Sequence, residues 1–498
     1  LVAMAVAGLA AAAPLSHASA TSKPAAETRA SAPPKPAVET RYAAVFMDGK
    51  KIGHAKHVRS VASGKVTTSE FVTMSISRMG TPMTIKLTES CVETVEGKPV
   101  SFKGVQDLGI IAQRLDGTID AAGKLTIAIG VGGAVQTRTM PWPKGALLPE
   151  GARKLSLAKG LAEGTKYSFM MFSPILSKGV KVDVAVGPMK EVDLLGRVVK
   201  LTEVKALMHG PSGAMPTVNY VDSGHHTLKS ATAMMGMELE IIDCPKAFAL
   251  SPNDTLDFFS RVMLSSPTPL KDVRKASSVT YHLQPTGKAK LNFPTTDNQQ
   301  VRQGGGQFIV TVRPAAAAKG VARPYKGKDP AALAALKPTR FLQSDDKKVV
   351  ELTRQAVGKT TDAAEAARRI EAFVAKHIKQ KDLSVGYASA AEVAQSGRGD
   401  CTEHALLTAA MCRAAGIPAR VATGLVYVER FADKTDLFGP HAWTEALIGD
   451  KWIGLDAAFK GYSPGHITLL VGDGELDEFF GIISTMGNFK IAKVEVTR

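Results

Sequence analysis

The first half of the chain alternates hydrophobic and polar residues over short stretches, which is the period-two pattern of β-strands. Runs rich in Val, Thr and Ile recur between turn pairs such as Asp48-Gly49 and Asp116-Gly117. The stretch from Tyr42 to Gly53 predicts a hairpin that turns at Asp48-Gly49. We therefore expect residues 41–262 to form a large antiparallel β domain whose sheet is open or half closed.

The pattern changes twice in the second half. Residues 263–337 predict a second, small β segment that ends in a linker rich in Ala, Pro and Lys. Residues 338–498 begin with helical periodicity, and two capping signals, Asp362-x-x-Glu365 and Ser389-x-x-Glu392, mark helix starts. From Ala419 the chain returns to strands, so helices packed on an antiparallel sheet predict an α+β domain here.

A helix is predicted from Cys401 to Ala415, directly after a glycine-containing turn. Ala, Leu and Met dominate this run, and all three favour helices. Asp400 is suited to cap the N-terminus, and Gly416 is suited to end the helix in the left-handed conformation. Cys401 would then lie on the first turn, where the helix dipole and unpaired backbone N–H groups favour a thiolate over a thiol.

A hairpin is predicted from Ala442 to Ala457, with its two-residue turn at 449–450. In this register Trp443 faces Asp456, and His441 lies two residues before Trp443 on the same face. His441 and Asp456 would be diagonal neighbours whose side chains can meet. Together with the upstream cysteine, they supply a nucleophile, a base and an orienting carboxylate, which are the groups that covalent acyl transfer requires.

At these residues the chain resembles the transglutaminase-like superfamily. The matching stretch runs from about Thr339 to Ala458, with its core in GRGDCTEHALLTAAMCRAAGIPAR and HAWTEALIGDKWIGLDAAF. The resemblance implies a papain-like core and cysteine chemistry, although the superfamily also includes inactive scaffolds. It further implies that Cys401 is the nucleophile, His441 the general base and acid, and Asp456 the partner that orients the imidazole.

Two further site residues are weaker candidates. The family tends to supply a side-chain donor for the oxyanion upstream of the cysteine, and Tyr387 is the candidate here. The backbone N–H of Cys401 is the alternative donor. Trp443 is most simply a sheet-packing aromatic, but an indole next to the site could instead line the substrate groove.

The N-terminal residues predict export. Residues 1–20 are apolar and close with Ala18-Ser19-Ala20, which is the pattern of a secretory signal peptide. Residues 21–40, rich in Pro, Ala and Thr, predict a disordered linker. We found no run long enough to span a bilayer. A periplasmic or extracellular location follows, where Cys91 and Cys244 are one conceivable disulfide pair.

Charge is distributed unevenly. The chain carries 62 Lys and Arg against 46 Asp and Glu, a net charge of +16, while residues 331–498 hold 21 of each sign. The whole excess lies in the first 330 residues, which suits either an anionic envelope polymer as partner or simply a solvated surface. Neither a nucleic-acid-binding motif nor a metal-binding motif is present, so we expect no nucleic acid partner, no metal and no cofactor.

The expected function is therefore a secreted cysteine enzyme that acts on amide bonds of a protein or peptide through a thioester acyl-enzyme. Hydrolysis is the default because water is always present. A protein-glutamine cross-linking transferase and a non-catalytic scaffold that binds peptide or glycan are the alternatives. The sequence leaves the oligomeric state open.

Overall fold

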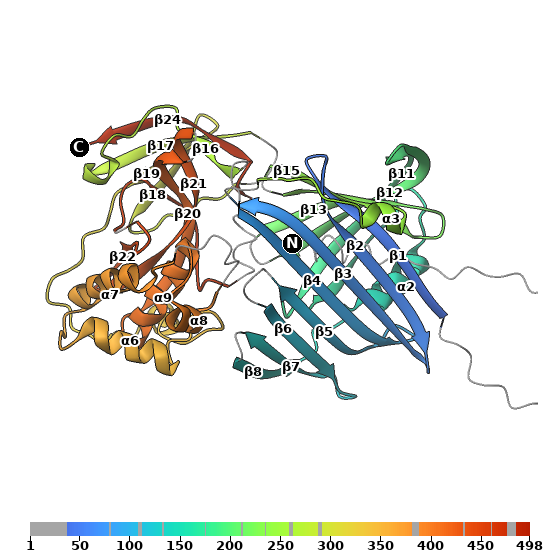
Figure 1. The fold of residues 1–498 in the computed structure, drawn as a ribbon, viewed down its shortest axis with the longest axis horizontal. Coiled ribbons are helices and arrows are strands. Elements are labelled where there is room, and N and C mark those ends of the chain that lie inside the picture. Colours follow the sequence, from blue (N-terminus) through green and yellow to red (C-terminus); the bar gives the residue numbers. More distant parts are fainter. Residues whose placement is uncertain are drawn as a thin grey trace, which may run out of the picture.

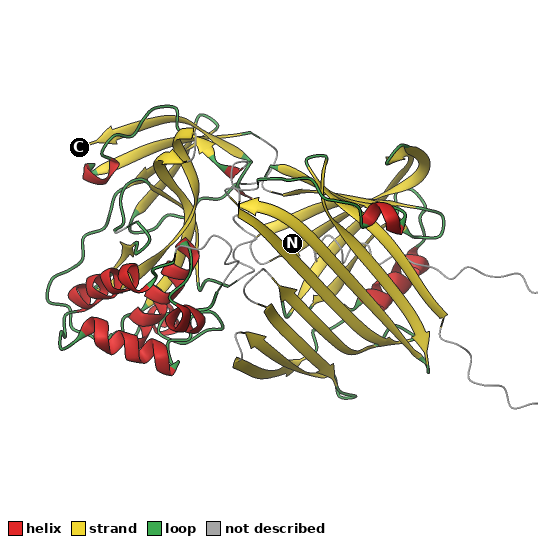
Figure 2. Cartoon of the chain, viewed as in Figure 1, coloured by secondary structure: helices red, strands yellow, loops and turns green. Residues whose placement is uncertain are grey.

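The computed structural model describes residues 37–498 except 79–80, 108–111, 132–133, 175, 211–212, 235, 258–261, 287–290, 381–387, 432–433, 460 and 476–484. Figure 1 shows two parts side by side: a large curved sheet, and a smaller part that contains most of the helices. Figure 2 shows that the large part consists mostly of strands and that most of the helices gather in the smaller part.

A single sheet of fifteen strands forms the N-terminal part, in the order β8-β7-β6-β5-β4-β3-β2-β1-β15-β14-β13-β12-β11-β10-β9. Neighbouring strands are antiparallel except β9 and β10, which are parallel. The strands are β1 (Ala37–Met47), β2 (Lys50–Ala62), β3 (Lys65–Arg78), β4 (Thr81–Thr94), β5 (Pro99–Asp107), β6 (Ala112–Ile119), β7 (Lys124–Val131), β8 (Ala134–Pro141), β9 (Ala146–Leu147), β10 (Lys166–Ser173), β11 (Lys178–Leu194), β12 (Arg197–Gly210), β13 (Gly213–Val221), β14 (Thr227–Met234) and β15 (Met237–Asp243).

The hairpin predicted at the start of this sheet is confirmed. Met47 of β1 pairs with Lys50 of β2, which leaves Asp48-Gly49 as a two-residue turn. Both turn residues have positive φ, 48° and 75°, as a turn that matches the twist of a hairpin requires.

The sheet curls around one helix, α2 (Pro149–Lys159), which lies on strands from its first half. Glu150 at the start of α2 binds Arg59 of β2 at 2.9 and 3.0 Å, and it also binds Arg153 within the helix. Glu93 of β4 caps the helix by accepting the N–H of Glu150 at 2.6 Å. On its other side α2 borders a cavity lined by strands from the second half of the sheet.

The C-terminal part contains the helices α5 (Pro330–Ala334), α6 (Lys347–Val357), α7 (Ala363–His377), α8 (Ala390–Ser396) and α9 (Cys401–Ala414). Its main sheet has the order β16-β21-β20-β23, with β22 paired to β21. These strands are β16 (Leu264–Ser265), β20 (Ala419–Phe431), β21 (Lys434–Ile448), β22 (Lys451–Leu455) and β23 (His466–Gly472). A short helix, α3 (Lys246–Ala249), follows the large sheet in sequence, and a 3-10 turn, η1 (Val273–Lys275), follows β16.

A second sheet of four strands, β18-β19-β17-β24, completes the C-terminal part. It consists of β17 (Ser278–Pro285), β18 (Gln299–Gly304), β19 (Gln307–Val312) and β24 (Phe489–Thr497). The last strand of the chain thus pairs with a strand about two hundred residues earlier. One hydrophobic core joins this sheet and the inner residues of β20 and β23 to β1, β2, β3 and β15 of the large sheet.

The helices share a second core with β20, β21 and β22. Both predicted capping signals are confirmed: Asp362 accepts the N–H of Glu365 at 2.8 Å, and Ser389 forms a capping box with Glu392. The expected helices packed on an antiparallel sheet and the expected large antiparallel sheet are both present. The α+β expectation holds only loosely, because strands outweigh helices over the described chain taken as a whole.

Candidate active site

Cys401 is the first residue of α9, as its capping sequence predicts. Asp400 accepts the N–H of Thr402 at 3.0 Å, and Glu403 in turn accepts the N–H of Asp400 at 2.8 Å. Both ends of this capping box are satisfied, so the start of the helix is fixed at the cysteine. The sulfur-bearing residue is partly exposed, whereas the rest of the helix is almost wholly buried.

The turn before the cysteine depends on Gly399 and on a buried carboxyl group. Gly399 has a φ of +151°, and a Cβ built on it would lie 2.2 Å from the Cβ of Glu403. Burial, reinforced by the charge of Asp400, raises the pKa of Glu403 well above its usual value. Glu403 also accepts the N–H of Ala388 at 2.8 Å, so this one side chain ties the preceding segment to the helix start.

The strand that carries the histidine is attached directly to this helix. Thr444 of β21 donates its hydroxyl to the carbonyl of Ala405 in α9, at 2.9 Å. The predicted hairpin register is confirmed, since Ile448 pairs with Lys451. Helix and hairpin therefore hold the cysteine and the histidine against each other across about forty residues of chain.

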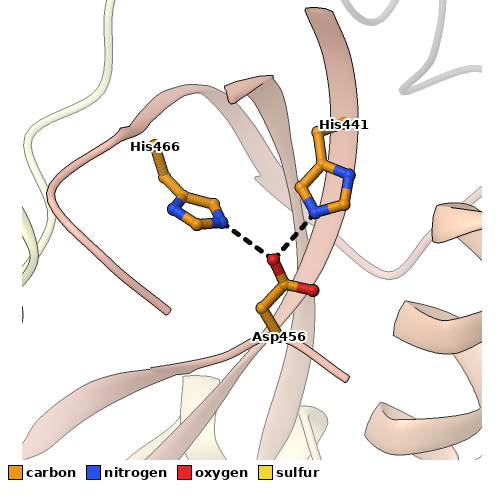
Figure 3. A group of neighbouring side chains, drawn as sticks. All are labelled: His441, Asp456 and His466. Atoms are coloured by element: carbon orange, nitrogen blue, oxygen red, sulfur yellow. Dashed lines mark hydrogen bonds and ion pairs between the residues drawn. The ribbon is translucent and has the colours of Figure 1, made fainter. Parts of the chain in front are cut away.

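His441 and Asp456 lie together in the structure, as the hairpin register predicts. The Nε2 of His441 is 2.9 Å from the Oδ2 of Asp456, and both side chains are about 1% exposed (Figure 3). Since Nε2 is used in this way, the other ring nitrogen, Nδ1, is left for the hydrogen bond that His441 shares with Cys401. Sulfur, imidazole and carboxylate form one continuous network.

This network determines the charges. Burial lowers the pKa of an imidazole, but the Asp456 carboxylate outweighs it and, together with Cys401, raises the pKa of His441 to about 10. Burial likewise opposes ionisation of Asp456, but the two neighbouring histidines lower the pKa of Asp456 well below its usual value. At neutral pH His441 is therefore a cation and Asp456 an anion.

The Asp456 carboxylate has four hydrogen-bonding partners. Its Oδ1 accepts the backbone N–H groups of Ala458 and Phe459, at 3.0 and 3.1 Å. Its Oδ2 accepts His441 and also a second imidazole, His466 at the start of β23, again at 2.9 Å. Figure 3 shows both rings pointing at the same oxygen. Every lone-pair direction of the carboxylate is used.

Aromatic rings surround the two histidines. The Phe459 ring meets the His441 ring edge-on at 4.8 Å, and Tyr462 lies 4.6 Å from the ring of His466. Trp443 contacts both histidine rings and is 1% exposed. This burial favours sheet packing, the first of the two roles considered for Trp443. Phe459 is 36% exposed and is the ring that borders solvent next to the imidazole.

Sequence reasoning missed three residues of this site. His466 lies ten residues beyond the carboxylate and is part of no recognisable motif. Glu371 of α7 accepts the backbone N–H of Asp456 at 2.6 Å, and nothing in a helical run of charges distinguishes it. Phe459 follows closely after the predicted hairpin, and this short distance in sequence from Asp456 is the one signal that could have placed it at the site.

The structure also bears on the other residues that the sequence suggested for an oxyanion donor, a disulfide or a metal site. Tyr387, the candidate oxyanion donor, lies outside the described residues. Cys91 and Cys244 are both free thiols, so this conceivable pair is not a disulfide here. Ligand atoms of His441, Asp456 and His466 lie within 4.8 Å of one another, close enough to hold a metal ion, but the three side chains already bond one another.

Comparison with known proteins finds a family match over part of the chain. Residues 350–457 match the family model of the transglutaminase-like superfamily. That segment contains Cys401, His441 and Asp456, so the transglutaminase-like core and the side-chain network coincide. Among curated proteins, none matches the chain.

Three solved structures are similar over part of the chain. A candidate cysteine protease of Cytophaga hutchinsonii has 19% identity and a TM-score of 0.29, covering 45% of this chain and 83% of its own. A β-barrel-like protein of Brucella abortus has 11% identity and a TM-score of 0.30, covering 41% and 94%. The periplasmic domain of TgpA from Pseudomonas aeruginosa, bound to ethylmercury, has 16% identity and a TM-score of 0.26, covering 46% and 83%.

Within the described residues, none of the helices combines the length and the apolar character needed to cross a membrane.

Proposed function

We propose that this protein is a transglutaminase-like cysteine enzyme that cleaves amide bonds of a protein or peptide. Residues 338–498 form the catalytic unit, preceded by the β domain of residues 41–262 and the small β segment and linker of residues 263–337. The observation that carries the proposal is the hydrogen-bonded set of a cysteine at a helix N-terminus, an imidazolium and a buried carboxylate.

The first half of the reaction forms an acyl-enzyme. The Cys401 thiolate attacks the carbonyl carbon of the amide, and an S–C bond forms. As the C–N bond breaks, the His441 imidazolium gives its proton to the leaving nitrogen, so an amine departs and a thioester remains. Asp456 holds the ring in the tautomer that keeps Nδ1 facing the sulfur.

The oxyanion of the tetrahedral intermediate needs a donor. The backbone N–H of Cys401 belongs to the first turn of α9, whose leading amides lack intrahelical partners. We assign this N–H to the oxyanion, where the positive end of the helix dipole adds to its effect.

The second half releases the acid. Neutral His441 takes a proton from water, the resulting hydroxide attacks the thioester carbon, and the C–S bond breaks to return the thiolate. An amine in place of water would give transfer instead. Hydrolysis is the proposed outcome because the acyl-enzyme meets water at far higher concentration than any amine.

The proposed setting is the cell envelope. Residues 1–20 would direct export, residues 21–40 would act as a tether, and the substrate would be a protein or peptide of the periplasm or exterior. The basic excess of the first 330 residues suits an anionic envelope polymer close to that substrate.

Mass spectrometry of envelope peptides incubated with the wild type and with Cys401→Ala tests the proposal. Hydrolysis gives new termini, a mass gain of one water per cut, and no products with the variant. A glutamine peptide with a labelled primary amine forms the second arm, in which incorporation of label would establish transfer as the activity. If neither product forms and Cys401 resists alkylation until the protein is denatured, the result would favour a non-catalytic scaffold.

A further inference from the structure

We propose that His466 is a positioning residue that shares the Oδ2 of Asp456 with His441 and so limits how tightly the carboxylate holds the proton of the catalytic imidazolium. The inference rests on the proposed function for its consequence in turnover, but its physical content concerns only three described side chains, His441, Asp456 and His466 (Figure 3).

Asp456 does not need His466 for its orientation. Its Oδ1 is held by two backbone N–H groups of its own turn, from Ala458 and Phe459. Its backbone N–H is held by Glu371. The first two bonds hold the Oδ1 of the carboxylate and the third holds the backbone of Asp456, and none of them involves a second histidine.

The two imidazoles compete for one carboxylate oxygen. Each Nε2 lies 2.9 Å from the same oxygen, Oδ2 of Asp456, and the ring centroids of His441 and His466 are 5.7 Å apart. A carboxylate oxygen shared between two donors gives each a weaker bond than it would give one alone. The second donor, His466, therefore weakens the hydrogen bond between Asp456 and His441.

The buried position of His466 determines its charge. Burial, assisted by the charge of His441, lowers the pKa of His466, so this ring is neutral and has a single N–H. A carboxylate is the strongest acceptor within reach, which places that hydrogen on Nε2. The unprotonated Nδ1 then accepts from Ser463, whose backbone N–H and hydroxyl both lie at 3.4 Å, while the carbonyl oxygen of Ser463 lies 2.9 Å from Nδ1 with no hydrogen between them.

The consequence is chemical. A general acid works best when its pKa is near the working pH, and Asp456 already raises the pKa of His441 to about 10. If His441 were the only imidazole bonded to Oδ2, the pKa of His441 would rise further, and the imidazolium would be a poorer proton donor to the leaving amine. His466 keeps the proton transferable without moving the carboxylate.

The test uses the full chain and the alkylation of Cys401 by iodoacetate, quantified on its own peptide by mass spectrometry. The anionic reagent is attracted to the neighbouring imidazolium, so the rate of alkylation falls at high pH, where His441 loses its proton. This fall is the alkaline limb of the pH–rate profile. The groups that face this ring are Cys401, Asp456 and His466, with Tyr462 and Glu371 behind them.

Two variants separate the hydrogen bond from the packing. His466→Leu keeps a comparable volume and removes the donor, and we expect the alkaline limb of the profile to move upward by about half a unit to one unit. His466→Gln places an amide N–H near the position of Nε2 and should restore the wild-type limb. His377, whose Nε2–H donates to the backbone oxygen of Ala394 at 3.1 Å in the same part of the chain, supplies the control as His377→Leu.

An unmoved or lowered limb in His466→Leu, or a His466→Gln profile equal to that of His466→Leu, would overturn the inference. Where turnover is measurable, kcat of His466→Leu should fall about three- to tenfold with little change in KM. The alkylation profile needs no substrate, so the inference stands or falls separately from the proposed function. An unfolding midpoint for each variant identifies any simple loss of fold.

Discussion

Asp456→Asn is the sharpest available perturbation of the site, because this carboxylate accepts two hydrogen bonds on each oxygen. An asparagine has one oxygen and one NH₂ group. With its oxygen toward the histidines, the NH₂ meets the N–H groups of Ala458 and Phe459; turned the other way, it meets His441 and His466. Either orientation leaves two buried donors unpaired.

The magnitude follows from these contacts. Leaving a buried donor unsatisfied costs about 1–3 kcal/mol, and removing one member of a buried ion pair about 3–5 kcal/mol in total. We therefore expect the free energy of unfolding to fall by about 3–5 kcal/mol at pH 7. We expect kcat to fall by about 10³–10⁴, the size seen where a triad loses the carboxylate that sets its tautomer.

Two assays check this prediction, urea unfolding and the pH profile of Cys401 alkylation by iodoacetate. Without the carboxylate, only Cys401 opposes the effect of burial, so the pKa of His441 should fall and the alkaline limb of the alkylation profile should lie below the wild-type value of about 10. Asp450→Asn, at the exposed turn of the same hairpin, is the matched control and should leave both assays unchanged. A variant at 456 that loses less than tenfold in kcat, or less than about 1 kcal/mol in stability, would refute the reasoning.

Three further predictions follow from other contacts. The pKa of His441 is raised on folding, so its contribution to stability is complete below about pH 6.5 and is lost as the pH rises through about 10. The difference in unfolding free energy between wild type and Asp456→Asn should therefore narrow between these pH values. A constant difference would contradict this prediction. Gly399→Ala should destabilise the start of α9 and slow Cys401 alkylation, since the added Cβ would overlap Glu403. Gly64 also has a positive φ but lies in open space, so Gly64→Ala should lower the free energy of unfolding by only about 1 kcal/mol. Equal losses of stability in the two variants would contradict this prediction. Glu150→Gln should cost about 3–5 kcal/mol by urea unfolding, because two buried arginines lose their anion, while Asp116→Asn in an exposed pair should change nothing measurable.

The sequence by itself determined the local features of the site. The cap at Asp400 and the start of α9 at Cys401 depend on side-chain to backbone bonds between residues at most three apart. The register that brings His441 to Asp456 depends on a two-residue turn, which permits one pairing. Such features involve only neighbouring residues, so their residue types and spacing are sufficient to predict them.

Tertiary structure decided the rest. The pairing of β1 with β15 and of β24 with β17 joins segments about two hundred residues apart, and no local pattern selects one distant strand over another with the same alternation. His466 and Glu371 reach Asp456 from elements that are separate in sequence, and their side-chain types alone fit many other roles. The chemistry of the triad is local, but the second imidazole that shares its carboxylate exists only because the folded chain returns to the same oxygen.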